Sequence, residues 1–531
     1  MEDGNMAKNR TSGLSRRQFV AALGAASVAA PGITRGADTE GTDRPNFLVI
    51  ISDQHRADCI AHKGNPDIRT PSLDALAKDG VHYEECFCPF PVCTPSRYSV
   101  LSGLYVNQHK GWNNRCTLHP DIPTFPKLLR AAGYSTACVG KMHFTPTYLD
   151  VGYDRMYLSE QDGDGRWDDD YHRELMKLGL VDINDLEDQV REFRAHARPE
   201  YMPRCGAIPS NLPLKHHSTE WAGRKALDLM DEWTGGGNLL TVSFIKPHHP
   251  FDPPPELEGL YDPAKVTLPP GWTPECFEHD LALHPGYFPH TSLTEESLRR
   301  VVAYYYATIE HIDTQIGSFV DALKRKGLYD NTVIVYLSDH GEYLGFHHMI
   351  LKGNHMYDAL ARVPLIVKYP NSKRAGERPR ELVSLIDVAP TILKQAGLEP
   401  ADKMAGLDLA VPGAGRSIAF CESFRGNQVM ARTNEHKLLL SRDPARSLLF
   451  DLKSDPLEQI DKAEDAEYAA VKQALTEKVL AWQGETPDFE AYVDLDAPQI
   501  DQPNVPPKDL GHRDAIIAYY RGKIREALNI V

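Results

Sequence analysis

The sequence predicts an α/β fold, in which a large, mostly parallel sheet is covered by helices on both faces and a smaller α+β subdomain follows. Three nearly continuous apolar runs are typical of buried parallel strands: 46–51, 239–245 and 332–337. Three amphipathic helical stretches alternate with them: 122–132, 218–233 and 294–326. Strands that alternate with helices form a parallel sheet with helices on each side.

The chain has 531 residues, which indicates a large domain and a smaller one. We expect the large domain at 38–415, a linker near Pro412–Gly415, and the α+β subdomain at 416–531. Polar, acidic residues at 159–212, which we expect to be helical, indicate an insertion over the sheet edge. The formal net charge of −16 argues against a nucleic-acid partner, because phosphate backbones need clustered basic side chains.

The first 37 residues resemble an export signal. Arg16 and Arg17 precede a short apolar run that ends near Ala30, which is typical of a Tat signal, whereas an ordinary amphipathic helix start is the alternative. This prediction implies the Tat export machinery as a partner, cleavage near Gly36–Ala37, and a periplasmic or secreted protein. No later segment is long and apolar enough to predict a stable membrane anchor.

The predicted strands end in residues that carry chemistry. Asp53 follows the first strand, His248 the second, and Asp339 and His340 the third. The carboxyl ends of parallel strands meet at one edge of a sheet, where such folds bind ligands. We therefore expect these side chains to form one site.

Cys93-Thr-Pro-Ser-Arg97 is the sharpest motif. Nearby prolines predict a shaped loop that enters a helix at Ser96. A helix N-terminus favours anions, and Arg97 adds a fixed charge that can grip two oxygens. An ordinary buried thiol is the alternative interpretation of Cys93.

Cys93, Pro95 and Arg97 match the C-x-P-x-R signature of the type I sulfatases, and the chain resembles this family of the alkaline phosphatase superfamily from Asn46 to about Trp482. The resemblance implies an alkaline phosphatase-like fold and a 38–415 catalytic domain. It implies hydrolysis of a sulfate ester, which we expect on a sulfated carbohydrate or small molecule. It also implies a maturation enzyme that oxidises Cys93 to formylglycine, the nucleophile of the family.

The resemblance further implies a divalent cation. Its expected ligands are Asp53, Gln54, residue 93, Asp339 and His340. Gln54 stands where many members have Asp, which resembles the Asp-Gln branch that includes phosphonate monoester hydrolases. His340 replaces the commoner Asn. Oxygen ligands favour Ca²⁺, which we expect first, and the imidazole makes Mn²⁺ a rival.

Four basic residues match other segments of the family: Lys141, His143, His248 and Lys352. The lysines would neutralise sulfate oxygens, His248 would protonate the leaving group, and His143 would orient or deprotonate the formylglycine diol. Taken singly, each is better explained as a surface charge or a structural histidine. Four other histidines are candidates for the pocket wall without an assigned role: His249, His347, His348 and His355.

Two other functions stay open. Gln54 and His340 favour a phosphonate monoester or phosphodiester hydrolase on the same fold, whereas residues 448–458 resemble the common sulfatase tail and favour a sulfatase. A non-catalytic glycan-binding protein is the second alternative, but the nucleophile and the acidic ligands are present. We expect the insertion at 159–212 and the loop at 251–289 to decide the substrate.

Overall fold

The computed structural model describes residues 44–281, 287–353, 355–423, 426–485 and 510–530. The predicted signal at 1–37 lies outside these residues. Within them, no helix is long and apolar enough to cross a membrane.

A seven-stranded sheet forms the centre of the unit that spans residues 41–531. Its strands lie in the order β2 (Val81–His82), β9 (Leu365–Lys368), β7 (Thr332–Ser338), β1 (Asn46–Asp53), β6 (Asn238–Pro247), β4 (Ser135–Gly140) and β5 (Arg155–Leu158). All pairs from β7 to β5 are parallel, and β9 runs antiparallel to both of its neighbours. The mostly parallel sheet and its three predicted strands are therefore confirmed.

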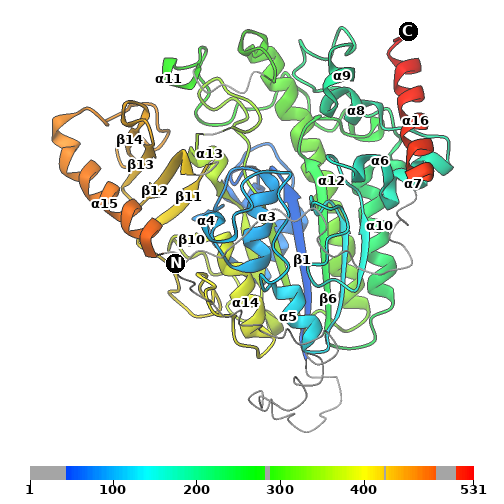
Figure 1. Cartoon of the computed structure of the whole chain (residues 1–531), viewed down its shortest axis with the longest axis horizontal. Coiled ribbons are helices and arrows are strands. Elements are labelled where there is room, and N and C mark those ends of the chain that lie inside the picture. Colours follow the sequence, from blue (N-terminus) through cyan, green and yellow to red (C-terminus); the bar gives the residue numbers. More distant parts are fainter. Residues whose placement is uncertain (1–43, 282–286, 354, 424–425, 486–509, 531) are drawn as a thin grey trace, which may run out of the picture. The chain divides into compact units, whose positions relative to one another are not determined.

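Helices cover both faces of this sheet, as predicted (Figure 1). One face carries α2 (Pro71–Asp79), α10 (Ser218–Asp231) and α12 (Glu295–Arg325); the other carries α3 (Cys93–Ser102), α5 (Phe125–Ala131) and α14 (Val388–Gln395). The side chains of β1 alternate between the two cores. Phe47 and Val49 pack into one, and Leu48 and Ile50 into the other.

Two smaller sheets accompany the large one. The first joins β10 (Val383–Ser384), β3 (Cys86–Phe87) and β8 (Arg362–Val363). The second is antiparallel, with β11 (Ala419–Glu422), β12 (Gln428–Arg432), β13 (His436–Ser441) and β14 (Leu448–Asp451) under α15 (Ala469–Glu485). This second sheet with its helix is the α+β part expected near the C-terminus, although the exact boundary at 415 stays a prediction.

The insertion is helical, with α6 (Gly165–Asp168), α7 (Asp170–Lys177), α8 (Ile183–Gln189) and α9 (Arg191–Arg194). The last helix, α16 (Leu510–Ala527), packs against α6, α7 and α8 and not against the small antiparallel sheet (Figure 1). Ile516, Tyr520 and Ile524 of α16 share a buried cluster with Leu186 and Phe193. The chain therefore returns to brace the insertion.

The start of α3 differs from the prediction. We expected the helix to begin at Ser96 after a proline-shaped loop, but α3 begins at Cys93. Pro95 is the third residue of this helix, where the backbone N–H has no intrahelical partner, so the missing donor costs little. Cys93 consequently lies at the helix N-terminus, fully buried.

Gly140 lies so close to the neighbouring strand β6 that the backbone leaves no room for a side chain. It ends β4 with φ +91°, and an added Cβ would lie 1.9 Å from the backbone oxygen of Ser243 on β6. Gly140→Ala should therefore lower the free energy of unfolding by more than about 1 kcal/mol, measured by urea denaturation. Gly259→Ala is the control, because a Cβ there meets open space. Equal stability of the two variants would contradict the strict packing of β4 on β6.

Candidate metal and anion site

The carboxyl ends of β1 and β7 bring four potential metal ligands together. Asp53 ends β1, and Asp339 and His340 directly follow β7, its parallel neighbour. Cys93 faces them, with Sγ 3.6 Å from Asp53 Oδ1 and 3.3 Å from His340 Nε2. One ligand atom from each of the four residues lies within 4.8 Å of all the others, and all four side chains are buried.

Gln54 and His340 leave acceptor atoms suited to a cation. Gln54 donates its side-chain N–H to Glu342, and its buried amide oxygen has no hydrogen-bond partner in the described chain. His340 Nδ1 lies 2.9 Å from the carbonyl oxygen of Gly341 and donates to it, so Nε2 is an acceptor. His340 Nε2 lies 3.2 Å from Lys352 Nζ, whereas the Gln54 oxygen is a buried acceptor without a donor, which is costly and which a divalent cation would satisfy. Carboxylate, amide and imidazole ligands together fit Ca²⁺ or Mn²⁺.

Arg97 holds the two carboxylates. Its Nε lies 2.7 Å from Asp339 Oδ2, and its Nη2 lies 3.1 Å from Asp53 Oδ2. We predicted that Arg97 grips two oxygens of an anion, but the oxygens it binds belong to these protein carboxylates. Arg97 therefore holds in place two of the expected cation ligands, Asp53 and Asp339.

The charge of Asp53 is fixed by its neighbours. Lys141 Nζ lies 2.7 Å from Asp53 Oδ2, and both side chains are buried. Burial alone would raise the pKa of Asp53, but Lys141 and the other basic groups nearby lower it well below its ordinary value. In turn, burial lowers the pKa of Lys141 and Asp53 raises it, with a net increase. Asp53 is therefore ionised and Lys141 charged at neutral pH.

Lys352 and His248 meet above Cys93. Lys352 Nζ lies 2.9 Å from Cys93 Sγ and 3.0 Å from His248 Nε2. His248 Nδ1 lies 2.7 Å from the carbonyl oxygen of His249 and donates to it, which leaves Nε2 to accept from Lys352. Burial and then Lys352 lower the pKa of His248 well below its usual value, so the imidazole is neutral.

A pocket of about 180 Å³ opens beside these residues, lined in part by Lys141, His143, His248 and Lys352. His143 is buried, and Asp162 Oδ2 lies 3.8 Å from its Nε2. The structure therefore places the four predicted basic residues around one cavity next to Cys93.

Other lining residues were missed by the sequence analysis: Asn114, Gln161, Asp162, Gln189, Tyr287 and Leu351. Three of them come from the insertion, and Tyr287 lies in the 251–289 loop. We expected these two segments to decide the substrate, and both line the pocket. His249 was a candidate without a role; it stacks on His248 at 4.2 Å between ring centroids, and Asp188 Oδ2 lies 2.6 Å from its Nδ1. Asn114, Gln161, Asp162 and Tyr287 lie in irregular segments, which have no periodicity, so no sequence signal separated them from their neighbours.

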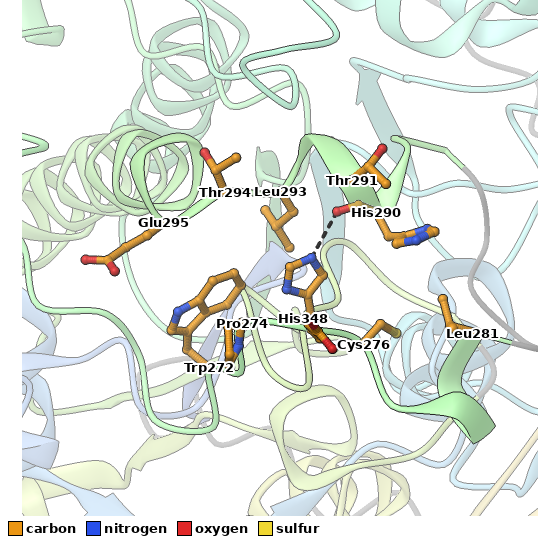
Figure 2. A pocket seen from close by; sticks show the side chains of 11 residues that line it. Trp272, Pro274, Cys276, Leu281, His290, Thr291, Leu293, Thr294, Glu295 and His348 are labelled. Atoms are coloured by element: carbon orange, nitrogen blue, oxygen red, sulfur yellow. Dashed lines mark hydrogen bonds between the residues drawn. The ribbon is translucent and has the colours of Figure 1, made fainter.

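The remaining histidine candidates lie elsewhere. His347 and His355 surround the buried carboxylate of Asp280, at 3.3 and 3.5 Å. His348 stacks on Trp272 in a separate, larger hollow of about 560 Å³, and its Nε2 lies 3.0 Å from the carbonyl oxygen of His290 (Figure 2). None of the predicted catalytic or metal-binding residues lines this hollow, so it does not hold the chemistry of the site.

The family model described as Sulfatase matches residues 45–398. The chain belongs to the sulfatase family. It is 28% identical over 462 residues to an arylsulfatase of Clostridium perfringens, covering 80% of this chain and 91% of the relative. It is 26% identical over 502 residues to an N-acetylglucosamine-6-O-sulfatase of Bacteroides thetaiotaomicron, covering 86% and 88% of the two chains.

The fold is also that of a phosphonate monoester hydrolase of Agrobacterium radiobacter, with a TM-score of 0.69, 24% identity, and coverage of 84% of this chain and 96% of that one. This likeness confirms the predicted alkaline phosphatase-like architecture and leaves the Asp-Gln branch a prediction. The sulfatase is a sulfuric ester hydrolase, and its family implies a divalent metal ion and a modified Cys or Ser. The cluster around Cys93 is where these residues fit such an ion.

Removal of the Arg97 charge tests the electrostatics of the cluster. Arg97→Met leaves two buried carboxylates without their shared partner and should cost about 3–5 kcal/mol of unfolding free energy. Excess Ca²⁺ or Mn²⁺ should recover part of this loss, because a cation opposes the same repulsion. Thermal unfolding with and without cation measures both effects.

Arg155→Met is the matched control, since Arg155 pairs with the half-exposed Glu232 at the surface. Its cost should stay below about 1 kcal/mol and should not respond to the cation. A similar, cation-independent loss in both variants would show that Arg97 does not balance the two carboxylates.

Proposed function

We propose that this sulfatase hydrolyses the sulfate ester of a sulfated carbohydrate, with formylglycine derived from Cys93 as nucleophile. The observation that carries the proposal is the position of Cys93. Its Sγ lies at the first turn of α3 between the acidic cluster and Lys352. The relative that acts on N-acetylglucosamine 6-sulfate supports a carbohydrate. The pocket supports it too, because Asn114, Asp162 and Gln189 offer hydrogen bonds to hydroxyl groups.

The basic residues are placed to bind the ester group. Lys141 and Lys352 lie on the walls of the pocket, and each ammonium can contact sulfate oxygens beside residue 93. Lys352 also donates to His248 Nε2 at 3.0 Å. This pair holds a proton beside residue 93, and we assign it the general-acid role toward the departing alcohol oxygen.

The modified side chain and the cation supply the remaining chemistry. Hydrated formylglycine has two hydroxyl groups on one carbon, one to attack sulfur and one to release sulfate afterwards. A divalent cation, when bound by Asp53, Gln54, Asp339 and His340, acidifies the attacking group and offsets charge on the sulfate. We propose Ca²⁺ as this cation, with Mn²⁺ as the rival because of the imidazole ligand. His143 borders the pocket and is assigned to orient the nucleophile.

A phosphonate monoester or phosphodiester is the second candidate substrate. Gln54 and His340 favour it, and so does the fold shared with a phosphonate monoester hydrolase. Sulfate monoesters and phosphate diesters carry the same single negative charge, so the basic pocket alone does not separate the two functions.

The test combines mass spectrometry with product assays. The protein is produced with a formylglycine-generating maturation enzyme, and the peptide that contains residue 93 should lose sulfur and gain the aldehyde oxygen. Sulfate release from sulfated amino sugars should rise in proportion to the aldehyde fraction, and Cys93→Ala should lose activity by several orders of magnitude.

Cys93→Ser is the matched comparison, because a serine can attack once but lacks the second hydroxyl group that releases sulfate. It should give less than a full turnover on the same substrates. Full activity of the unmodified thiol would contradict the proposed nucleophile. Cleavage of a phosphonate monoester without sulfate release from any ester would favour the second function.

We further propose that the chain is exported through the Tat route to the periplasm or the exterior, on the basis of Arg16 and Arg17. Replacement of both by lysine should leave the precursor in the cytoplasm, measured by cell fractionation and immunoblotting. Lys8 and Arg10 lie in the same basic stretch, and their replacement by glutamine is the control, which should leave delivery unchanged. Equal delivery of the twin-lysine variant would contradict this route.

A further inference from the structure

Glu342 is a fully buried carboxylate that no sequence motif singles out. It lies four residues beyond the end of β7. Its Oε2 accepts a hydrogen bond from the side-chain nitrogen of Gln54. Its Oε1 accepts from the backbone N–H of Leu344 at 3.1 Å and from that of Leu351. One carboxylate therefore binds three donors from two separate segments of the site.

The hydrogen bond between Gln54 and Glu342 defines the orientation of the Gln54 side-chain amide. Glu342 Oε1 already accepts from two backbone N–H groups, and its Oε2 accepts from Gln54, so the NH₂ end of the amide faces the carboxylate. The amide oxygen then occupies the opposite side, where it is buried and has no hydrogen-bond partner among the described residues. Reversal would set two acceptor oxygens against each other at Glu342.

The hydrogen bonds from Leu344 and Leu351 to Glu342 hold the two ends of the loop that precedes Lys352. Leu344 and Leu351 have left-handed backbone conformations, with φ of 46° and 71°, which residues other than glycine rarely adopt. Such conformations cost free energy and persist only where other contacts hold them. Glu342 binds the backbone N–H of both residues, and Lys352, whose Nζ lies 2.9 Å from Cys93 Sγ, follows directly.

We propose that Glu342 is a positioning residue that links the cation site to the sulfate-binding lysine. It fixes Gln54 with its amide oxygen toward the cation, and it fixes Leu351 so that Lys352 reaches residue 93. Glu342 therefore acts on the cation through Gln54 and on the ester through Leu351 and Lys352. The inference rests on the proposed function for the cation and the ester.

Glu342→Gln tests the link with almost no change in volume. A glutamine both donates and accepts, so either orientation of the Gln54 amide is then satisfied. The affinity of the metal-free protein for Mn²⁺, measured by isothermal titration calorimetry, should fall about 10- to 100-fold, the usual effect of losing a group that orients a metal ligand. The KM for the sulfate ester should also rise, because Lys352 is less well fixed.

A double-mutant cycle separates positioning from general destabilisation. Gln54→Ala alone should weaken Mn²⁺ binding, but in the Glu342→Gln background it should add little, because the ligand is already misplaced. Glu422→Gln is the control: Glu422 is another buried carboxylate, which accepts a backbone N–H from Asn107 at 2.7 Å, and its replacement should leave Mn²⁺ affinity unchanged.

Unchanged Mn²⁺ affinity in Glu342→Gln, or losses that simply add in the double mutant, would overturn the proposal. If Glu342→Gln does not fold, Glu342→Asp replaces it, since the shorter carboxylate cannot keep all three contacts. Wild-type affinity in that variant would equally overturn it. A wild-type protein that binds no divalent cation would overturn this inference and the proposed cation together, whereas tight binding by wild type and variant alike would overturn this inference alone.

Discussion

The site depends on two carboxylates, Asp53 and Asp339, that the sheet holds together out of contact with water. β1 and β7 are parallel neighbours in register up to Ser52 and Ser338, so the residue that follows each serine arrives at the same edge. The two carboxylates have oxygens within 4.8 Å of each other, and two buried negative charges this close are unfavourable unless positive charge accompanies them. The shared guanidinium of Arg97 and the ammonium of Lys141 supply that charge and fix the ligand geometry.

This constraint explains why an acidic protein can act on an anion. The whole chain carries a formal net charge of −16, yet the cluster combines its two carboxylates with Arg97, Lys141 and Lys352. A divalent cation adds two further positive charges and makes the local field attractive to a sulfate ester. The pocket can therefore attract an anion although the chain as a whole has a negative net charge.

Sequence periodicity predicted the parts of the molecule that depend on local pattern. The strand ends that deliver Asp53 and Asp339 were predicted correctly, and so was α12, whose observed bounds of Glu295–Arg325 differ by a single residue at each end from the predicted range. The helix start at Cys93 was missed, because a proline in a sequence usually indicates the end of a helix, although the first turn tolerates it. The packing of α16 on the insertion was missed because it joins segments far apart in the chain. Periodicity does not predict side-chain directions either, which is why the partners of Arg97 and the contacts of Glu342 emerged only from the structure.

The location of the cation tests the central claim most directly. Crystals of the protein grown with Mn²⁺ can be measured at a wavelength where manganese scatters anomalously. The cluster predicts a strong anomalous peak within coordination distance of Asp53, Gln54, Asp339 and His340, beside residue 93. A peak elsewhere, or the absence of any peak in crystals whose dissolved protein still releases sulfate, would contradict a catalytic cation at the carboxyl ends of β1 and β7.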